Sequence, residues 1–508
     1  MARLTEFQSK ELLRSSGILT PKGAVGATPE ACGEIAAQLG GTVVVKAQIG
    51  ATNRAEIGAV RVVSSAREAA TAAREMFEAT EAAQILVEER IKVAAEYYVG
   101  IVMDDRERCP VLLASASGGS GIEQRESTIH RISLDVLADV SPKQFLAFTI
   151  AAGLPEDASL VLERLWRLAR RSDARSAEIN PLARSENGQL IALDCRISID
   201  DYSVFRHPEF GIDFARETAA PPTELDHIAW KLESDDYRGT FFFLQLPRQH
   251  EGWPLIGFHG CGGGGAIAAL DALSRAELEA ADFVDTSGNP PASKVYRATR
   301  IILSQPGITG YFLCGSGMAS QDQADLARAL VKAFREENLE IPAVLRLGGN
   351  GEDRAAIIMQ RYAAGAGAAI ETYQKEHSTE FCVSRLRHLV EANKQTPHRP
   401  NLGSAGEMRA QPPAAYSFET RTGQIHYEHA LCKLCESKAC IAACQPDILK
   451  LVDDLPVLAI SAADAKRGRC TECLACEEEC WNQGNHGATI DFPIAGLLAY
   501  RKEHASSS

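Results

Sequence analysis

The sequence predicts an α/β protein of several domains that ends in a small cysteine-rich domain. Between about Glu251 and Leu389, apolar strands, glycine turns and helices alternate, which is typical of an open parallel sheet covered by helices. Near the end of the chain, eight cysteines fall in two short runs. The length of 508 residues is enough for roughly three or four domains with cores of their own.

Composition and charge exclude several classes of protein. The chain is 45% hydrophobic and 24% charged, and its net charge of −14 argues against nucleic acid as the main partner. No apolar run reaches transmembrane length, and the first residues, MARLTEFQSKELL, lack the apolar core of a signal peptide. We therefore expect a cytoplasmic protein with no membrane partner. Its fourteen cysteines are then metal ligands or free thiols rather than disulfides.

The first two hundred residues predict alternating helices and strands. The stretch LTEFQSKELLRSSGI carries an apolar helical stripe that ends near Gly17, and GTVVVKAQI predicts a strand with one lysine, Lys46. Further on, SAEINPLARSENGQLIALDCRI predicts two strands joined by a hairpin turn in SENGQ. Asn180 on the first strand and Asp194 on the second are oxygen ligands that suit Mg²⁺ bound with nucleotide phosphates.

The second segment repeats one pattern of strand, glycine loop and helix. Its three copies are PLIGFHGCGGGGAIAALDAL, GYFLCGSGMASQDQADLARALVKAF and IPAVLRLGGNGEDRAAIIMQ. Ligands of such a sheet lie at the carboxyl ends of its strands, where glycine loops before helix N-termini suit anions. Close packing explains any single glycine loop equally well.

The two cysteine runs resemble a bacterial-type ferredoxin over about Gln424 to Pro493. Their spacings are C-x2-C-x4-C-x3-C and C-x2-C-x2-C-x3-C. In two-cluster ferredoxins the fourth cysteine of each run binds the cluster of the other run. The resemblance therefore implies two [4Fe–4S] clusters, one held by Cys432, Cys435, Cys440 and Cys480 and the other by Cys444, Cys470, Cys473 and Cys476. A pair of structural zinc sites is the alternative.

A segment rich in proline, glycine and polar residues precedes the cysteine runs. It reads NKQTPHRPNLGSAGEMRAQPPAAYS and predicts an exposed linker over residues 393–420, followed by the ferredoxin domain over residues 424–495. Exposed connectors tolerate truncation. A chain that ends near Glu391 is therefore expected to keep any chemistry of the preceding domains, unless the ferredoxin domain packs on them and is needed for folding.

The chain from about Leu4 to Ala392 resembles the β subunit of succinyl-CoA synthetase and related NDP-forming acyl-CoA synthetases. The motifs are LTEFQSKELL, VVVKAQ, ILVEERIKVAAEYYVGIVMD, AEINPL, IALDCRISIDD, VFRHPEF and IPAVLRLGGNGED, in the order and spacing of that family. The resemblance implies an ATP-grasp domain over residues 1–225 and a flavodoxin-like CoA-ligase domain over residues 245–392.

The resemblance also implies roles for individual residues. Lys46 corresponds to the nucleotide-phosphate lysine and Glu88 to a hinge residue near adenine and ribose. Glu96 matches the glutamate that handles the phosphohistidine at the ATP-grasp site. Asn180 and Asp194 match the Mg²⁺ ligands. For the two glutamates, a solvated charge at a helix or strand end is the alternative interpretation.

Three stretches depart from the family pattern. The phosphate loop is replaced by IGATNRAEIGAV, in which Asn53 and Arg54 stand where an archaeal-type loop has histidine and lysine, and Arg54 is a candidate phosphate ligand. His259 replaces an asparagine close to substrate. The substrate loop becomes CGSGMASQD, with Gly315 and Gly317 as the candidate contacts. These changes predict an acid other than succinate.

The resulting hypothesis is a β-type subunit of an acid–CoA ligase that uses Mg-ATP or Mg-GTP. Its chemistry would pass through acyl phosphate and phosphohistidine, and an α-like partner would supply that histidine and most of the CoA site. The small carboxylic acid and CoA are the other substrates, and an oxidoreductase is the expected partner of the ferredoxin domain. The alternative is an electron-transfer subunit whose synthetase-like body is a scaffold or an ATP-dependent gate. A ferredoxin domain with a purely structural role is the third interpretation.

Overall fold

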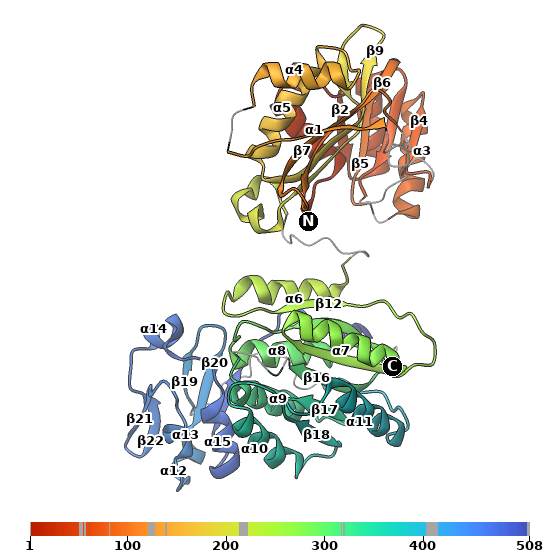
Figure 1. Cartoon of the computed structure of the whole chain (residues 1–508). Helices are drawn as coiled ribbons and strands as arrows, with labels where there is room; N and C mark the ends of the chain where they lie inside the picture. Colours follow the sequence, from red (N-terminus) through yellow and green to blue (C-terminus); the bar gives the residue numbers. More distant parts are fainter. Residues whose placement is uncertain are drawn as a thin grey trace. The chain divides into compact units, whose positions relative to one another are not determined.

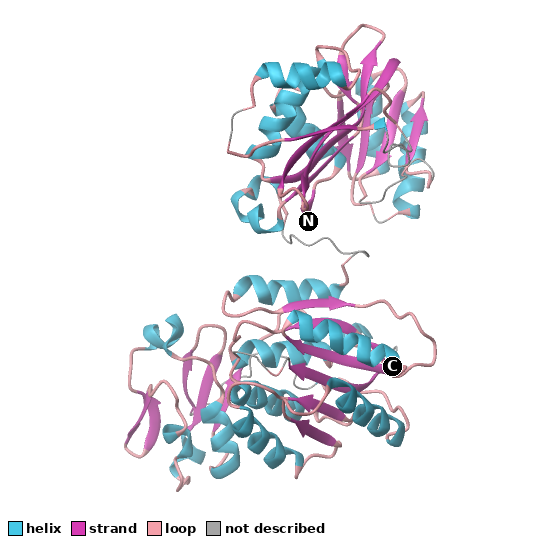
Figure 2. Cartoon of the chain, in the orientation of Figure 1, coloured by secondary structure: helices cyan, strands magenta, loops and turns pink. Residues whose placement is uncertain are grey.

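The computed structural model describes residues 2–49, 54, 57–80, 82–119, 128–137, 140–212, 222–315, 317, 321–402 and 415–504. The chain divides into two compact units, Met1–Ala219 and Ala220–Ser508, each with its own layers of helix and sheet (Figures 1 and 2). Within the described ranges, no helix is both long and apolar enough to cross a bilayer.

The first unit contains two antiparallel sheets. One has the strand order β1–β11–β9–β6–β7–β8 with β10 beside β9, and the other has the order β2–β5–β3–β4. The strands are β1 (Ala2–Arg3), β2 (Gly23–Gly26), β3 (Val43–Ala47), β4 (Val60–Val63), β5 (Ile85–Glu89), β6 (Val93–Asp104), β7 (Cys109–Ser115), β8 (His130–Ser133), β9 (Ala174–Ser185), β10 (Leu190–Ala192) and β11 (Cys195–Ile199). The predicted hairpin is present, because β9 and β10 pair on either side of the SENGQ turn.

Helices cover these sheets and close two hydrophobic cores. They are α1 (Glu6–Ser15), α2 (Pro29–Leu39), α3 (Ala66–Ala79), α4 (Pro142–Ala151), α5 (Ala158–Arg171) and the 3₁₀ turns Asp201–Arg206 and Pro208–Phe210. Helix α1 begins with a capping box, in which the Thr5 hydroxyl accepts a hydrogen bond from the Gln8 amide. Its inward face buries Glu6 and Lys10 beside Leu13, so two charges lie where the apolar stripe predicted only a core contact.

The second unit is built on a sheet with the order β12–β15–β13–β16–β17–β18, and β14 lies beside β13. Strands β15, β13, β16, β17 and β18 are parallel and follow the order 2-1-3-4-5 of flavodoxin-like folds, while β12 is antiparallel at the edge. The bounds are β12 (Phe242–Gln245), β13 (Leu255–Cys261), β14 (Glu279–Ala280), β15 (Asp282–Asp285), β16 (Ile308–Gly315), β17 (Ala343–Arg346) and β18 (Ile370–Tyr373). The open parallel sheet predicted from the strand–glycine–helix pattern is therefore present.

Helices cover both faces of this sheet (Figure 1). They are α6 (Glu224–Asp235), α7 (Gly263–Arg275), α8 (Ala292–Ile302), α9 (Gln323–Glu337), α10 (Glu352–Ala363) and α11 (Thr379–Ala392). Helices α7 and α11 contact each other, and α9 lies between α8 and α10. Every residue of α8 is buried, which shows that this helix is covered by more than its own sheet.

The cysteine-rich region provides that cover. Its strands β19 (Ala415–Glu419), β20 (Gln424–Glu428) and β23 (Ala488–Asp491) form one antiparallel sheet, and β21 (Leu449–Val452) and β22 (Leu455–Leu458) form a hairpin. The helices are α12 (His429–Lys433), α13 (Ala439–Ala442), α14 (Ala462–Asp464), α15 (Ala475–Gln483) and α16 (Leu497–His504), with a π turn over Ala465–Arg469. Helix α15 contacts α9, so this region belongs to the same compact unit as the parallel sheet.

The predicted exposed linker over residues 393–420 is only partly an exposed connector, because Lys394 to Pro397 are exposed whereas other residues of the range pack on the rest of the unit. Strand β19 lies inside this range and pairs with β20. The side chain of His398 is buried, and its backbone amide donates a 2.7 Å hydrogen bond to the carbonyl of Ile308. Residues 403–414 lie outside the described residues. The linker was predicted from local composition, which does not reveal that a polar segment packs on a distant strand.

Candidate functional site

The first candidate site is a cluster of charged side chains inside the first unit. Lys46 on β3 contacts carboxylate oxygens of Glu6 at 2.8 Å and Glu88 at 2.6 Å, and Lys10 contacts the same two glutamates at 2.6 Å each. Both ammonium groups also donate to the backbone carbonyl of Leu193. Helix α1 and strands β3 and β5 therefore meet through ion pairs at this point.

Arg54 connects this cluster to the predicted metal ligand. Its Nη2 atom lies 2.8 Å from Glu6 Oε2 and 2.8 Å from Asp194 Oδ2. Glu6, Lys10, Lys46, Arg54, Glu88 and Asp194 thus form a continuous set of three cations and three carboxylates, which we call the ion-pair network. Within it Glu6 is 2% exposed, Arg54 13% and Asp194 39%, so the network opens to solvent at Asp194.

The charges of the network keep Glu6 and Lys46 ionised. Burial alone would raise the pKa of Glu6, but Lys10, Lys46 and Arg54 hold that pKa far below its usual range. Burial likewise would lower the pKa of Lys46, whereas Glu6, Glu88 and Asp194 raise it above its ordinary value. Lys46 is therefore a fixed positive charge at neutral pH, as a phosphate ligand must be.

Asn180 and Glu96 lie at a second point, around Gly119. The Gly119 amide donates to Asn180 Oδ1 at 2.7 Å, and a Cβ atom on Gly119 would lie 2.8 Å from Glu96 Oε2. Gly119 has φ of +87°, so glycine is required there for conformation as well as for space. The Asn180 amide also donates to the carbonyl of Asp194 at 3.0 Å, which holds the two predicted metal ligands on adjacent backbone.

Two of these observations alter the roles predicted from the sequence. Glu88 is 3% exposed and both of its oxygens are bound to lysines, so the structure does not present it as a free hydrogen-bonding group for a ribose. Sequence reasoning also missed Glu6 and Lys10, which complete the network. The polar residues on the inward face of the LTEFQSKELL helix are the signal that could have identified them. Asn53 and the rest of its loop, apart from Arg54 and the residues from Ile57 on, lie outside the described residues.

The carboxyl edge of the parallel sheet is the second candidate site. Gly315 ends β16, and its carbonyl accepts a hydrogen bond from Arg346. Gly317 follows with φ of +78° and lies close to Lys375. The other residues of the substrate loop, 316 and 318–320, lie outside the described residues.

His259 does not face this edge as a substrate ligand would. The side chain is fully buried, with Nδ1 2.8 Å from the Tyr311 hydroxyl and Nε2 2.8 Å from the Thr286 hydroxyl. Burial lowers the pKa of His259 to about 3, so the ring is neutral. The prediction that His259 contacts a ligand is therefore wrong in this structure, because both ring nitrogens already have protein partners.

The third candidate site is formed by the eight cysteines, which the structure gathers into two sets of four. Burial raises the pKa of Cys440 to about 12, and the neighbouring thiols of Cys480, Cys432 and Cys435 contribute to the rise. Cys480 thus joins the first run although it comes last in the second.

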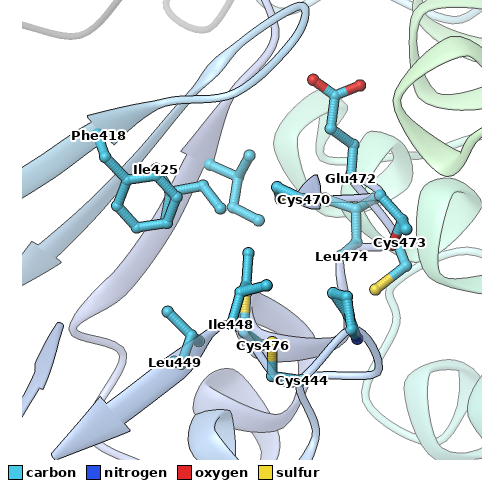
Figure 3. Close-up of a pocket in the computed structure, with 13 residues that line it drawn as sticks. Phe418, Ile425, Cys444, Ile448, Leu449, Cys470, Glu472, Cys473, Leu474 and Cys476 are labelled. Atoms are coloured by element: carbon cyan, nitrogen blue, oxygen red, sulfur yellow. The ribbon is translucent and has the colours of Figure 1, made fainter. Parts of the chain in front are cut away.

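The other four thiols form the second set. Burial raises the pKa of Cys476 well above its ordinary value, and Cys473, Cys470 and Cys444 raise it further. They line an apolar pocket closed by Phe418, Ile425, Ile448 and other side chains (Figure 3). The resemblance to a ferredoxin implies the same two sets as cluster ligands, and that role stays a prediction. In the described part of the chain, no three His, Cys, Asp or Glu side chains converge as ligands of a single ion do.

Glutamates between these cysteines attach the cysteine-rich region to the parallel-sheet body. Glu472, between Cys470 and Cys473, lies 2.5 Å from Arg238 and 2.7 Å from the Ser293 hydroxyl, and its carboxylate points away from the pocket (Figure 3). Two glutamates of α15 form similar ion pairs with α9. Glu477 lies 2.8 Å from Lys332, and Glu478 lies 2.9 Å from Arg328. All of these side chains except Arg238 are at least nine-tenths buried, so the contact lies in the interior of the unit and breaking it would leave buried charges unpaired.

Comparison with known proteins assigns the chain to a family. The ATP-grasp domain family matches residues 3–184. The β subunit of GDP-forming succinate–CoA ligase from Thermus thermophilus is 30% identical over 369 residues, which cover 70% of this chain and 93% of that subunit. The chain belongs to the succinate–CoA ligase β-subunit family. The ADP-forming relative from Methanothermobacter thermautotrophicus is 31% identical over 398 residues, covering 76% of this chain and 99% of that subunit.

Family membership makes the chain a subunit of an acid–CoA ligase. The solved structure of ATP citrate lyase from Methanothrix soehngenii has the same fold, with a TM-score of 0.60 and 19% identity over 76% of this chain and 99% of that chain. The matches cover almost the whole length of these relatives but leave about a quarter of this chain unmatched. This succinate–CoA ligase β-type chain therefore carries an addition that these relatives lack.

Proposed function

We propose that this chain is the nucleotide-binding β-type subunit of an NDP-forming acid–CoA ligase and that its cysteine-rich domain carries two [4Fe–4S] clusters. The observation that carries the ligase function is the ion-pair network, in which Arg54 contacts Asp194 and shares Glu6 with Lys46, inside a chain of the succinate–CoA ligase β-subunit family. Cations and a metal-binding carboxylate at one point are what a magnesium–nucleotide complex requires.

The residues at this site have separate proposed roles in binding phosphate and metal. Lys46 and Arg54 would hold phosphate oxygens, and Arg54 offers a planar fork that suits them. Asp194 and Asn180 would hold Mg²⁺, and their oxygen atoms fit that ion. The bound magnesium–nucleotide supplies the phosphoryl group and neutralises part of its charge. Glu96, beside Gly119, is the candidate to handle an incoming phosphohistidine.

An α-type subunit is the proposed partner, because the relatives are named as β subunits of succinate–CoA ligase. It would supply the phosphohistidine and most of the CoA site, while Gly315 and Gly317 lie at the sheet edge where the acid and CoA would meet. We propose an acid other than succinate, since the substrate loop departs from the family pattern. His259 lends no support to this choice, because it is buried away from that edge.

The ligase function is tested with the purified complex of this chain and its α-type subunit. Acid-dependent and CoA-dependent formation of ADP or GDP is the expected result, with a series of short carboxylic acids to find the substrate. Nucleotide hydrolysis that responds to neither the acid nor CoA would refute the ligase function.

The grouping of thiols supports the clusters. Each set contains four cysteines, the number of ligands of one [4Fe–4S] cluster. The backbone amide of Ala488 donates to Cys480 Sγ at 3.3 Å, a contact that stabilises a thiolate. The clusters supply one-electron transfer, for which an oxidoreductase is the proposed partner.

Anaerobically purified protein is expected to contain about eight iron atoms and about eight acid-labile sulfides per chain, the content of two [4Fe–4S] clusters. Elemental analysis and visible absorbance measure this directly. Replacing Cys470 by Ser should remove about half of the iron, since each cluster has its own four ligands. Stoichiometric zinc in colourless protein would exclude the clusters.

A second function, an electron-transfer subunit with a scaffold body, is favoured by one observation. Asp194 is paired with Arg54 and is therefore not a free metal ligand in this structure. Under this alternative the clusters reduce reversibly while the complex shows no turnover that depends on acid and CoA. The same preparation thus discriminates between the two functions.

A further inference from the structure

Arg54 and a metal ion would need the same oxygen atom. The Arg54 guanidinium lies 2.8 Å from Asp194 Oδ2, and Asp194 is the most exposed member of the ion-pair network and the only carboxylate of it that a solute can reach. The same Nη2 atom of Arg54 also lies 2.8 Å from Glu6 Oε2. The three positive and three negative groups of the network are therefore paired with one another, and Asp194 is not available to a metal ion while Arg54 holds it.

A free divalent cation meets two obstacles at this point. It must displace the guanidinium from Asp194, and it must then remain beside Lys46 and Arg54, which repel it. A nucleotide removes both obstacles at once. Its phosphates attract Arg54 and Lys46, and the metal that they carry takes the vacated carboxylate.

We infer that Arg54 competes with the metal ion for Asp194, so that Mg²⁺ enters this site as its nucleotide complex and not as the free ion. The inference rests on the proposed nucleotide site and adds a positioning role for Arg54 and its anchor Glu6. It makes the binding of metal and nucleotide mutually dependent, with the same coupling in both directions.

Direct metal binding tests this, with Mn²⁺ as the probe because its electron paramagnetic resonance signal reports the free ion. Wild-type chain is expected to bind Mn²⁺ weakly alone and tightly when saturating ADP is present. Arg54→Gln should bind Mn²⁺ alone at least about fivefold more tightly than wild type, the effect expected for loss of one partly exposed ion pair. The same variant should bind ADP more weakly.

A matched control is Arg61→Gln, which removes an arginine from the adjacent strand β4. Arg61 pairs with Glu75 outside the network and should alter neither affinity. The double variant Arg54→Gln, Asp194→Ala should lose the added Mn²⁺ binding, which assigns the bound ion to Asp194. Thermal unfolding of each variant verifies that the chain remains folded.

The outcomes separate the inference from the proposed function. Wild-type chain that binds Mn²⁺ without ADP as tightly as with it would overturn the inference, whether or not the variants fold. So would an Arg54→Gln chain that binds ADP more weakly but Mn²⁺ no better. Absence of any ADP binding in the presence of metal would instead refute the nucleotide site on which the inference depends.

Discussion

A chain that is cut after Glu391 is expected to be unfolded in its second unit, even when it is produced together with its α-type partner. The composition of residues 393–420 suggests the opposite, a free connector at which the chain can be shortened without harm. The structure reverses this expectation, because the cysteine-rich region and the C-terminal helix supply buried partners to the parallel-sheet body.

Arg501 on α16 shows how large the effect is. Its guanidinium lies 2.6 Å from Glu337 and donates at 2.7 Å to the Ser304 hydroxyl, and both charged side chains are fully buried. Burial alone would raise the pKa of Glu337, but His398, Arg501 and Arg300 hold it at about 2, so this carboxylate is charged at neutral pH. Removing one partner of a buried ion pair costs about 3–5 kcal/mol, and the cut removes several such partners together.

Single substitutions on α16 test the same buried contacts in the full-length chain. Arg501→Leu should lower the midpoint of thermal unfolding by several degrees, whereas Lys502→Leu, on the exposed side of the same helix, should leave it nearly unchanged. Differential scanning calorimetry of the anaerobic chain measures both. A truncated chain that is soluble, binds its partner and still makes acyl-CoA would restore the cysteine-rich domain as a detachable electron carrier.

Asp194→Ala is expected to reduce nucleotide-dependent turnover on the order of a hundredfold or more, a loss typical of removing one charge-stabilising group from a catalytic site. Asp194 is the exposed carboxylate of the ion-pair network and is held next to Asn180 by a backbone hydrogen bond. Without it the proposed magnesium site keeps no anionic ligand. The measurement is acid-dependent and CoA-dependent formation of ADP or GDP by the assembled complex.

Two controls accompany this variant. Glu186→Ala removes an exposed acid from the turn after β9 and should leave turnover unchanged. Iron content should be equal in wild type and in Asp194→Ala, because the cysteines lie in the other unit of the chain. Full activity of Asp194→Ala would reject the proposed metal site and favour a body that serves only as a scaffold.

Much of the candidate site could be predicted because it depends on short stretches of sequence. The hairpin that carries Asn180 and leads to Asp194 is specified by the SENGQ turn and its flanking apolar residues. The pairing of Glu88 with two lysines could not be predicted, since a strand pattern says nothing about which lysines approach a carboxylate from elsewhere. The ligand contact predicted for His259 was wrong for a similar reason, because its hydrogen-bond partners Tyr311 and Thr286 come from other parts of the chain.

By itself, the sequence determined the parallel sheet with its glycine loops and the eight cysteines in two runs, because spacing along the backbone sets periodicity and local ligand geometry. Only the tertiary structure decided what these parts contact. Arg238 and Glu472 are 234 positions apart, and Arg54 and Asp194 are 140 apart, yet each pair lies within hydrogen-bonding distance. A buried charge requires a partner but does not specify where in the chain that partner lies, so folding of the whole unit selects it.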